Sequence, residues 1–179
     1  MLKKILFVLL LVIVVFVCVV ALLPADYRIT RAATISAPPA VVFEQVNDFH
    51  KWYDWSPWAK LDPAAKNTFD GAPSGVGAIF SWSGNDKVGE GKMTLTESHP
   101  DDLIRIKLDF VKPYENSANT EISFKPEGNQ TLVTWSMSGK NNFFGRAVCV
   151  FMNMDKMLGA DFEKGLAQLK TVAEAAVKK

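Results

Sequence analysis

Side chains of the kinds that catalyse reactions or bind metals are few in this sequence, and they do not fall into a known pattern. The two histidines, His50 and His99, stand far apart, and neither has a metal-ligating partner at a useful spacing. No Gly-x-Ser-x-Gly, Cys-x-x-Cys or His-Glu-x-x-His motif is present. The stretch 84–87, Gly-Asn-Asp-Lys, lacks the Gly-Lys-Ser/Thr of a phosphate-binding loop. We therefore predict no metal and no cofactor.

One carboxylate, Asp155, has a position that could matter for chemistry. At 100° per residue along a helix predicted from about 144 to 177, Asp155 falls in the same arc as the apolar Phe162 and Ala173. A carboxylate facing a core must be paired or hydrogen-bonded, because burial of an unpaired charge is unfavourable. Three roles follow from this placement: a structural bond, an anchor for the polar head of a ligand, or a general base with a raised pKa.

Tryptophans concentrate in the stretch FHKWYDWSPWAKLDP, residues 49–63, which contains Trp52, Trp55 and Trp58 at a spacing of three. Pro57 and Pro63 prevent a long helix there. Large amphipathic side chains in a short irregular segment suit either a structural plug or direct contact with a ligand. We expect them along the rim of a cavity, where they would close one end of it.

Alternating apolar and polar residues predict a series of half-buried antiparallel strands. The clearest is Leu103–Phe110, in which Arg105, Lys107 and Asp109 form the polar face. The other predicted strands are 27–36, 78–82, 91–97, 119–125 and 131–138. Most of their apolar faces should be core, and a part of them should line a pocket; the candidate lining residues are Trp82, Phe110, Trp135 and Met137.

Two helices complete the predicted domain. The first begins after Ser36-Ala37-Pro38-Pro39, a serine near the cap followed by proline in the first turn, and ends near Asn47. The second is a long C-terminal helix whose apolar side must pack into the concave face of the sheet if both are to be buried. We therefore predict an α+β fold, a curved antiparallel sheet wrapped around a long helix, with a cavity between them whose mouth lies near the first helix.

The N-terminus reads as a membrane segment. Ile5–Leu23 is 19 residues long, and its one polar side chain is Cys18. At about 1.5 Å per residue it extends roughly 28 Å, close to the thickness of the hydrocarbon layer. We predict a transmembrane anchor over residues 1–24, with cleavage near Val19-Val20-Ala21 as the alternative. Lys3 and Lys4 favour a cytoplasmic N-terminus, which would place the remainder outside the inner membrane, in a periplasm or its equivalent.

The remaining residues, 25–179, suit one domain with its own core. The whole chain has 20 basic and 19 acidic residues and no run of like charges, so nucleic acid is not an expected partner. Its two cysteines, Cys18 and Cys149, leave the domain with a single thiol and no internal disulfide.

Four stretches resemble the START/polyketide-cyclase (SRPBCC) superfamily, in particular the bacterial proteins of the polyketide cyclase/dehydrase and lipid-transport type. They are ISAPPAVVFEQVNDFHKWYDWSPW, GNDKVGEGKMT, TLVTWSMSGKNNFFG and MDKMLGADFEKGLAQLK. The resemblance spans about residues 26–170 and implies a helix-grip fold with a cavity for a hydrophobic ligand. It does not imply one reaction, because the superfamily includes binders, cyclases and domains that regulate partners.

Three functions remain open on this basis. The first is a membrane-anchored binding module for a hydrophobic small molecule such as a lipid, a quinone or a polyketide-like compound. The second is a cyclase or dehydrase that uses an inward acid such as Asp155. The third is a domain that regulates a protein partner by binding it through the helix-grip surface; a filled core with a large exposed apolar patch would favour it. The first needs an apolar cavity with few polar groups, and the second needs convergent titratable groups.

Overall fold

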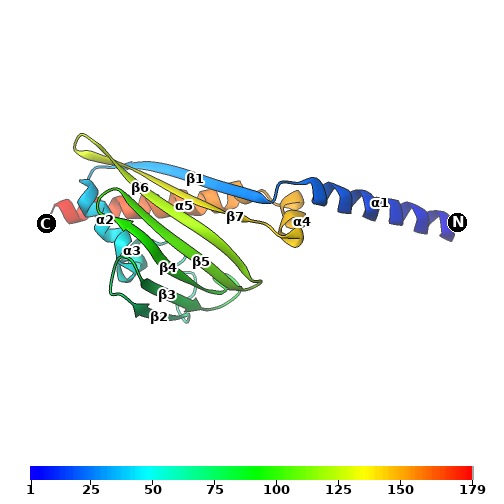
Figure 1. Cartoon of the computed structure of the whole chain (residues 1–179), viewed down its shortest axis with the longest axis horizontal. Coiled ribbons are helices and arrows are strands. Elements are labelled where there is room, and N and C mark those ends of the chain that lie inside the picture. Colours follow the sequence, from blue (N-terminus) through cyan, green and yellow to red (C-terminus); the bar gives the residue numbers. More distant parts are fainter. Residues whose placement is uncertain (179) are drawn as a thin grey trace.

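The computed structural model describes residues 1–178, which form an antiparallel sheet, a long C-terminal helix and a projecting N-terminal helix (Figure 1). The seven strands of this described part are ordered β1-β7-β6-β5-β4-β3-β2. Each pairs antiparallel with its neighbour. The strands are β1 (Asp26–Ile35), β2 (Lys66–Gly71), β3 (Ala78–Ser83), β4 (Glu90–His99), β5 (Leu103–Lys112), β6 (Asn116–Glu127) and β7 (Gln130–Lys140).

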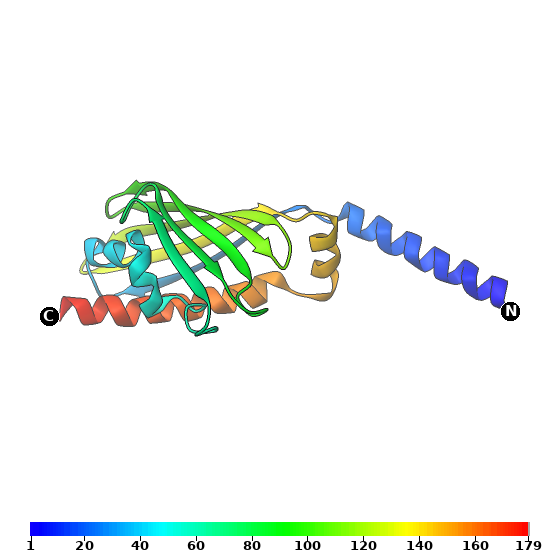
Figure 2. The same cartoon turned by 90° about the horizontal axis from the view of Figure 1, so that it is seen from below.

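The sheet curves around α5 (Met154–Val177), which runs along its concave face in Figures 1 and 2. The helix packs directly along β1, and its buried side chains include Phe162, Leu166 and Leu169. On the strands, inward residues such as Ile104 and Ile106 are buried, while their neighbours along the chain face solvent. The predicted helix-grip arrangement is therefore confirmed, and the alternation along the strands explains how the sheet acquires its two different faces.

Between β1 and β2 the chain forms three short helices that cover one end of the concave face. They are α2 (Pro39–Asn47), the 3-10 turn Phe49–Lys51 and α3 (Trp52–Trp55). Proline occupies the first position of α2, as predicted, and Val42, Phe43 and Val46 are its buried face. These residues join Trp52 and Trp55 in the same core as the inward side chains of the sheet. The tryptophan stretch is thus held against both the sheet and α5.

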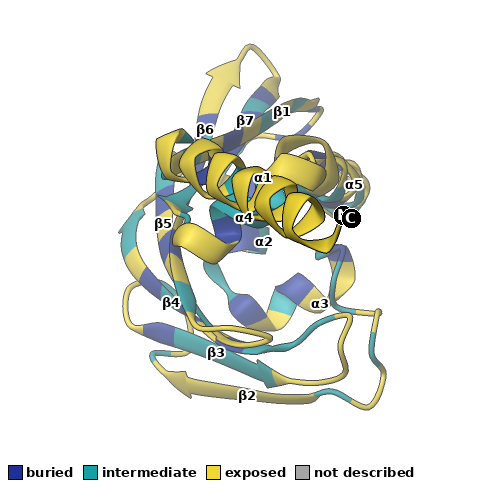
Figure 3. Cartoon of the chain, turned by 90° about the vertical axis from the view of Figure 1, so that its right-hand side faces the viewer, coloured by how far each residue is buried: buried dark blue, intermediate teal, exposed yellow. Residues whose placement is uncertain are grey.

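The N-terminal helix α1 (Leu2–Leu22) projects away from the domain, with nearly all of its apolar surface exposed (Figure 3). Within the described residues it is the one helix long and apolar enough to cross a membrane. By length and composition alone, such a helix fits an anchor and also fits a signal sequence.

Two elements differ from the sequence prediction. Strand β2 was not predicted, because its sequence, Lys-Asn-Thr-Phe-Asp-Gly, has no apolar alternation; it forms as an exposed edge strand paired only with β3. The long helix predicted from 144 is in fact two helices, α4 (Phe143–Phe151) and α5. The chain is extended at Met152, and the side chain of Asn153 caps α5 by accepting a hydrogen bond from the backbone N–H of Lys156 at 2.9 Å.

Candidate functional site: an aromatic cavity

A cavity of about 320 Å³ lies between the concave face of the sheet, the tryptophan stretch and the N-terminal half of α5. This volume is at the lower end of the range found for small-molecule sites. Its inner wall is aromatic or aliphatic. The side chains of this wall are Phe49, Trp52, Trp58, Phe69, Phe80, Trp82, Met93, Leu108, Phe110, Trp135, Met137, Leu158 and Phe162.

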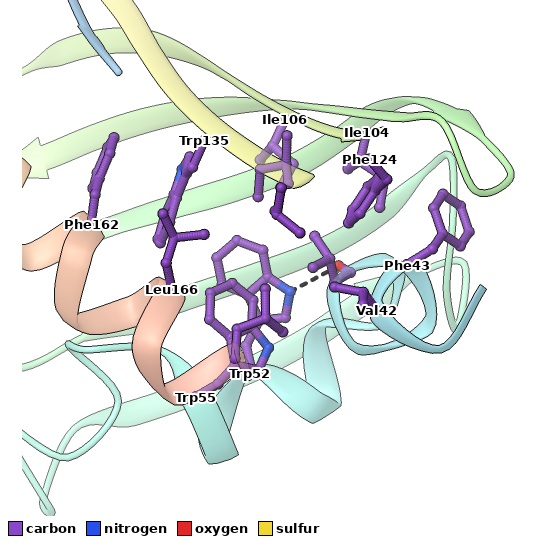
Figure 4. Close-up of a cluster of buried hydrophobic side chains, with 14 of the residues drawn as sticks. Val42, Phe43, Trp52, Trp55, Ile104, Ile106, Phe124, Trp135, Phe162 and Leu166 are labelled. Atoms are coloured by element: carbon purple, nitrogen blue, oxygen red, sulfur yellow. Dashed lines mark hydrogen bonds between the residues drawn. The ribbon is translucent and has the colours of Figure 1, made fainter. Parts of the chain in front are cut away.

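Trp135 on β7 is the centre of the aromatic cluster (Figure 4). Its ring stacks on Phe162 of α5, with centroids 4.3 Å apart and planes inclined by 4°. Trp55 and Trp58 meet it edge to face at 5.7 and 5.9 Å. A Cβ at Gly165 would lie 2.8 Å from the Trp135 ring, so this glycine lets α5 come close to the sheet. The cluster fixes the helix against the sheet and forms one end of the cavity.

Three indole N–H groups of this region donate to backbone carbonyls. Trp52 and Trp55 donate to backbone carbonyls of α2 at 2.9 and 3.0 Å, and Trp82 donates to the carbonyl of Val88 at 2.9 Å. The N–H of Trp135 is buried, yet it has no hydrogen-bond partner among residues 1–178. An unpaired buried donor is unfavourable by about 1–3 kcal/mol. A lining residue of the cavity therefore carries an unused donor.

A second polar group on the wall is the hydroxyl-bearing Thr120 of β6, which is also buried. Thr120 lies directly opposite Met137 on β7, so it is a diagonal neighbour of Trp135 on the same face of the sheet. Diagonal neighbours in antiparallel strands are roughly 7–8 Å apart. Thr120 and Trp135 are therefore neighbouring residues of the cavity wall.

The charged residues of the lining lie at the rim rather than on the inner wall. Asp62 braces two loops: its carboxylate accepts hydrogen bonds from the backbone N–H of Asn85 at 2.7 Å and of Ala64 at 3.0 Å. Lys112, also at the rim, pairs with Glu90 at 2.8 Å, and the hydrogen bond from Lys112 lowers the pKa of Glu90. In the described part of the chain, no three His, Cys, Asp or Glu side chains gather as metal ligands would.

Six of the eight residues predicted to line a ligand site do line the cavity: Trp52, Trp58, Trp82, Phe110, Trp135 and Met137. Trp55 does not, because it points into the core beside α5 and is fully buried. Two of the three tryptophans differ from the predicted rim position, since Trp52 and Trp55 are interior residues, whereas Trp58 is half-buried. No residue of α2 lines the cavity, and its exposed lining residues are Tyr53, Asn67, Phe69, Asp86, Lys87, Lys112 and Pro113. The mouth therefore lies away from α2, between α3, β2 and the turns at 84–89 and 112–113.

The predicted inward position of Asp155 is wrong. Its side chain is 62% exposed and forms a salt bridge with Arg31 of β1, with Nη2 and Oδ2 separated by 3.1 Å. The Arg31 guanidinium also pairs with Glu163 at 2.7 Å. Hydrogen bonding to Arg31 lowers the pKa of Asp155, the opposite of what a general base in an apolar pocket would need. The wheel relation itself holds, because Asp155 and Phe162 both belong to α5 and lie about 20° apart on it. Asp155 is in the first turn of α5, where this side of the helix meets the Arg31 side chain and solvent instead of the buried core.

Several lining residues were not predicted. Phe69 is on the unpredicted edge strand β2, and it stacks on His50 with centroids 4.1 Å apart. Leu158 and Phe162 were identified only as the apolar side of the helix, because the wheel does not distinguish the part that faces a cavity from the part that faces packed core. The alternation that predicted inward residues on the strands applies equally to Phe80, so it was a usable signal there.

A family profile described as "Polyketide cyclase / dehydrase and lipid transport" matches residues 26–174. The chain belongs to this family. The match covers the sheet, the tryptophan stretch and nearly all of α5, and it leaves out α1. It confirms the resemblance found in the sequence motifs. No curated protein matches the chain.

Solved structures share the fold at low sequence identity. Protein MLL2253 from Mesorhizobium loti is 16% identical with a TM-score of 0.61, over 83% of this chain and 98% of that one. Protein CV1439 from Chromobacterium violaceum is 16% identical with a TM-score of 0.59, over 85% and 99%. The di-domain ARO/CYC StfQ from the steffimycin biosynthetic pathway is 10% identical with a TM-score of 0.62, over 87% and 53%. At these identities the likeness concerns the fold alone.

Proposed function

We propose that this family member is a binding module that holds a hydrophobic small molecule in the cavity between the sheet and α5. The observation that carries the proposal is a cavity of about 320 Å³ whose inner wall is largely aromatic. One of its lining residues, Trp135, has a buried N–H without a hydrogen-bond partner among residues 1–178. An apolar enclosure with a small number of polar groups is the usual form of a site for hydrophobic ligands. The ligand class is a lipid, a quinone or a polyketide-like molecule.

The polar groups of the wall restrict the ligand further. An indole N–H is a donor only, and a threonine hydroxyl both donates and accepts. A carbonyl or hydroxyl oxygen on an otherwise apolar ligand would accept a hydrogen bond from the hydroxyl of Thr120, a lining residue of the cavity. A pure hydrocarbon would leave the donor unpaired, and a carboxylate would be buried without a cation on the inner wall. We therefore favour a neutral ligand with one oxygen function.

A cyclase or dehydrase remains the alternative, since the family description includes these enzymes. The acid assigned to this role from the sequence, Asp155, pairs with Arg31 outside the cavity. The charged groups that do line the cavity, such as Asp62 and Lys112, are at the rim and engaged with neighbouring loops or strands. An acid or base on the inner wall would favour catalysis, and the apolar inner wall favours binding.

The proposal also assigns α1 as a membrane anchor and residues 25–179 as the domain that it holds. Helix α1 has 21 residues, which corresponds to roughly 30 Å at about 1.5 Å per residue. Lys3 and Lys4 at its start favour a cytoplasmic N-terminus, so the domain would lie outside the inner membrane.

The test is whether filling the cavity removes a bound molecule. Leu108 lines the cavity, and its neighbour Lys107 is exposed on the outer face of the same strand. Leu108→Trp should fill part of the space, whereas Lys107→Trp adds the same side chain outside. Native mass spectrometry of the full chain, followed by organic extraction, should detect a bound hydrophobic molecule in the wild type and in Lys107→Trp, and much less in Leu108→Trp. Absence of such a molecule from the wild type, or equal retention in Leu108→Trp, would contradict the proposal.

A further inference from the structure

The helix α4 turns its apolar side outward. On a wheel of 100° per residue, Phe143, Phe144, Ala147, Val150 and Phe151 fall within an arc of about 120°. Phe144 is 62% exposed and Phe151 is 78% exposed. Gly145 is the buried residue of the helix. A surface helix of a water-soluble domain normally has the reverse arrangement, with its apolar stripe against the core.

The exposed side of α4 continues directly into the apolar surface of α1. Phe151 stacks on Phe16 of α1, with ring centroids 5.9 Å apart. Arg146 of α4 donates from Nη1 to the carbonyls of Ala21 and Leu23, at 3.0 and 3.3 Å. These carbonyls belong to the C-terminal end of α1, where backbone acceptors lack partners within the helix. Helix α4 is therefore fastened to the end of the proposed anchor, and the two form one exposed apolar surface.

The position of the contact along α1 suits a membrane interface. Phe16 precedes the last residue of α1, Leu22, by six positions, which is about 9 Å along the helix axis. Interfacial helices bury their apolar side roughly 5–10 Å into the boundary between headgroups and acyl chains. Helix α4 also runs across the direction of α1 in Figures 1 and 2. If α1 spans the bilayer, α4 lies along the surface of the bilayer, and the Phe151 side chain points toward the acyl chains.

The same end of the domain carries the mouth of the cavity. Tyr114, in the turn after β5, packs edge to face on Phe144 of α4 with centroids 6.1 Å apart. The two residues before Tyr114, Lys112 and Pro113, line the cavity. The β3–β4 turn, which also lines it, adjoins this segment: Glu90 just after that turn pairs with Lys112. The rim and the outward side of α4 are thus adjacent.

From these observations we infer that α4 lies in the membrane interface and holds the mouth of the cavity at the lipid surface, so that the ligand enters from the bilayer. The inference rests on the proposed role of α1 as an anchor. The occupant of the apolar side of α4 is lipid, because that side is continuous with a helix of membrane-spanning length and meets it at interfacial depth. A second copy of the chain on the same side is the competing occupant.

The test measures lipid contact at single positions of the full chain in nanodiscs that hold one copy each. A Cys18→Ala, Cys149→Ala background receives one new cysteine with an environment-sensitive fluorophore, at Phe151→Cys, at Val12→Cys in the middle of α1, or at Lys164→Cys on an exposed part of α5. One set of discs contains phosphatidylcholine brominated near the headgroup end of its acyl chains, which reports on positions 151 and 164. A second set contains phosphatidylcholine brominated near the methyl end, which reports on position 12. The label at 151 should be quenched at least about twofold more than the label at 164, as expected for a side chain within the interface.

The other outcomes separate this inference from the proposed function. Quenching at 12 together with equal, low quenching at 151 and 164 would overturn the inference and leave the anchor intact. Low quenching at all three positions would overturn the anchor and the inference together. Disulfide formation between two Phe151→Cys copies in vesicles, without quenching at 151 in single-copy discs, would show that α4 is a contact between copies and would also overturn it.

Discussion

The unpaired N–H of Trp135 leads to a prediction that compares the stability of phenylalanine substitutions at two neighbouring tryptophans. Trp135 and Trp55 are both buried in the same aromatic cluster, with centroids 5.7 Å apart. The indole of Trp55 donates to the carbonyl of Gln45 at 3.0 Å, whereas that of Trp135 has no partner among residues 1–178. Replacement of either tryptophan by phenylalanine removes similar packing. The hydrogen-bond consequences have opposite signs.

In the ligand-free protein, Trp135→Phe removes an unsatisfied donor and should recover about 1–3 kcal/mol, which offsets part of the packing loss. Trp55→Phe should instead lose a further 0.5–1.5 kcal/mol or so, since it breaks a hydrogen bond that contributes about that much. The free energy of unfolding should therefore be roughly 1.5–4.5 kcal/mol lower for Trp55→Phe than for Trp135→Phe. For a chain of this size each kcal/mol shifts Tm by roughly 2–4 °C, so the two variants should differ by at least about 3 °C.

The assay is thermal unfolding of the full chain in detergent after delipidation, followed by circular dichroism. A Tm of Trp55→Phe equal to or above that of Trp135→Phe would refute the reasoning, because the two substitutions remove the same atoms and only Trp55→Phe also breaks a hydrogen bond. The same pair also tests the ligand contact. If the ligand accepts from Trp135, Trp135→Phe should weaken its binding by about 2- to 13-fold, the equivalent of one hydrogen bond of about 0.5–1.5 kcal/mol.

Three further predictions concern the outer contacts and the anchor. Because Arg31 lowers the pKa of Asp155, their contact should stabilise the fold above about pH 4, and this stabilisation should be lost as the pH falls further. Asp155→Asn should therefore lower Tm at about pH 7 and leave it unchanged near pH 2. It should not reduce the amount of bound ligand, and a reduction would contradict the exposed placement of Asp155. Gly159→Ala should displace the Arg31 guanidinium from Asp155 and Glu163, since a Cβ there would overlap it. The difference in Tm between about pH 7 and pH 2 should therefore be smaller than in the wild type, and an unchanged difference would contradict this. Deletion of residues 1–25 should give a soluble, folded domain, as judged by fractionation and circular dichroism. In the full chain, protease added outside spheroplasts should digest the domain. Full protection of the domain would reverse the proposed orientation.

Much of the fold could be predicted from the sequence because its strongest signals are local. Alternation in β5 identified Ile104 and Ile106 as inward residues, and both are buried. The same alternation predicted Trp82 and Trp135 as lining residues, since side chains two apart share a face. What alternation cannot give is the distance between opposing faces. Whether an inward side chain meets another or a space depends on the curvature of the sheet and on the path of the helix.

Trp55 illustrates this limit. From the sequence it is equivalent to Trp52 and Trp58, three residues away on either side. In the structure α3 is one short turn, after which the chain leaves the helical path at Ser56. Trp52 and Trp58 therefore reach the cavity, while Trp55 is directed at the core beside α5. Three residues turn a helical side chain by about 300°, so Trp52 and Trp55 differ in direction by about 60° within α3, and Trp58 lies beyond the end of that helix.

The break at 152–153 has a larger consequence, because it separates two apolar sides that a single helix would have to keep in one direction. In an unbroken helix the apolar residues of 143–151 would continue the stripe that includes Phe162 and would be drawn against the sheet. An extended Met152 followed by the Asn153 cap frees α4 from that phase. Helix α5 can then bury its stripe under the sheet while α4 presents Phe144 and Phe151 outward beside α1. These two residues thus account for the exposed apolar side of α4, so a substitution that restores a continuous helix there would be expected to disturb the membrane end of the domain before its core.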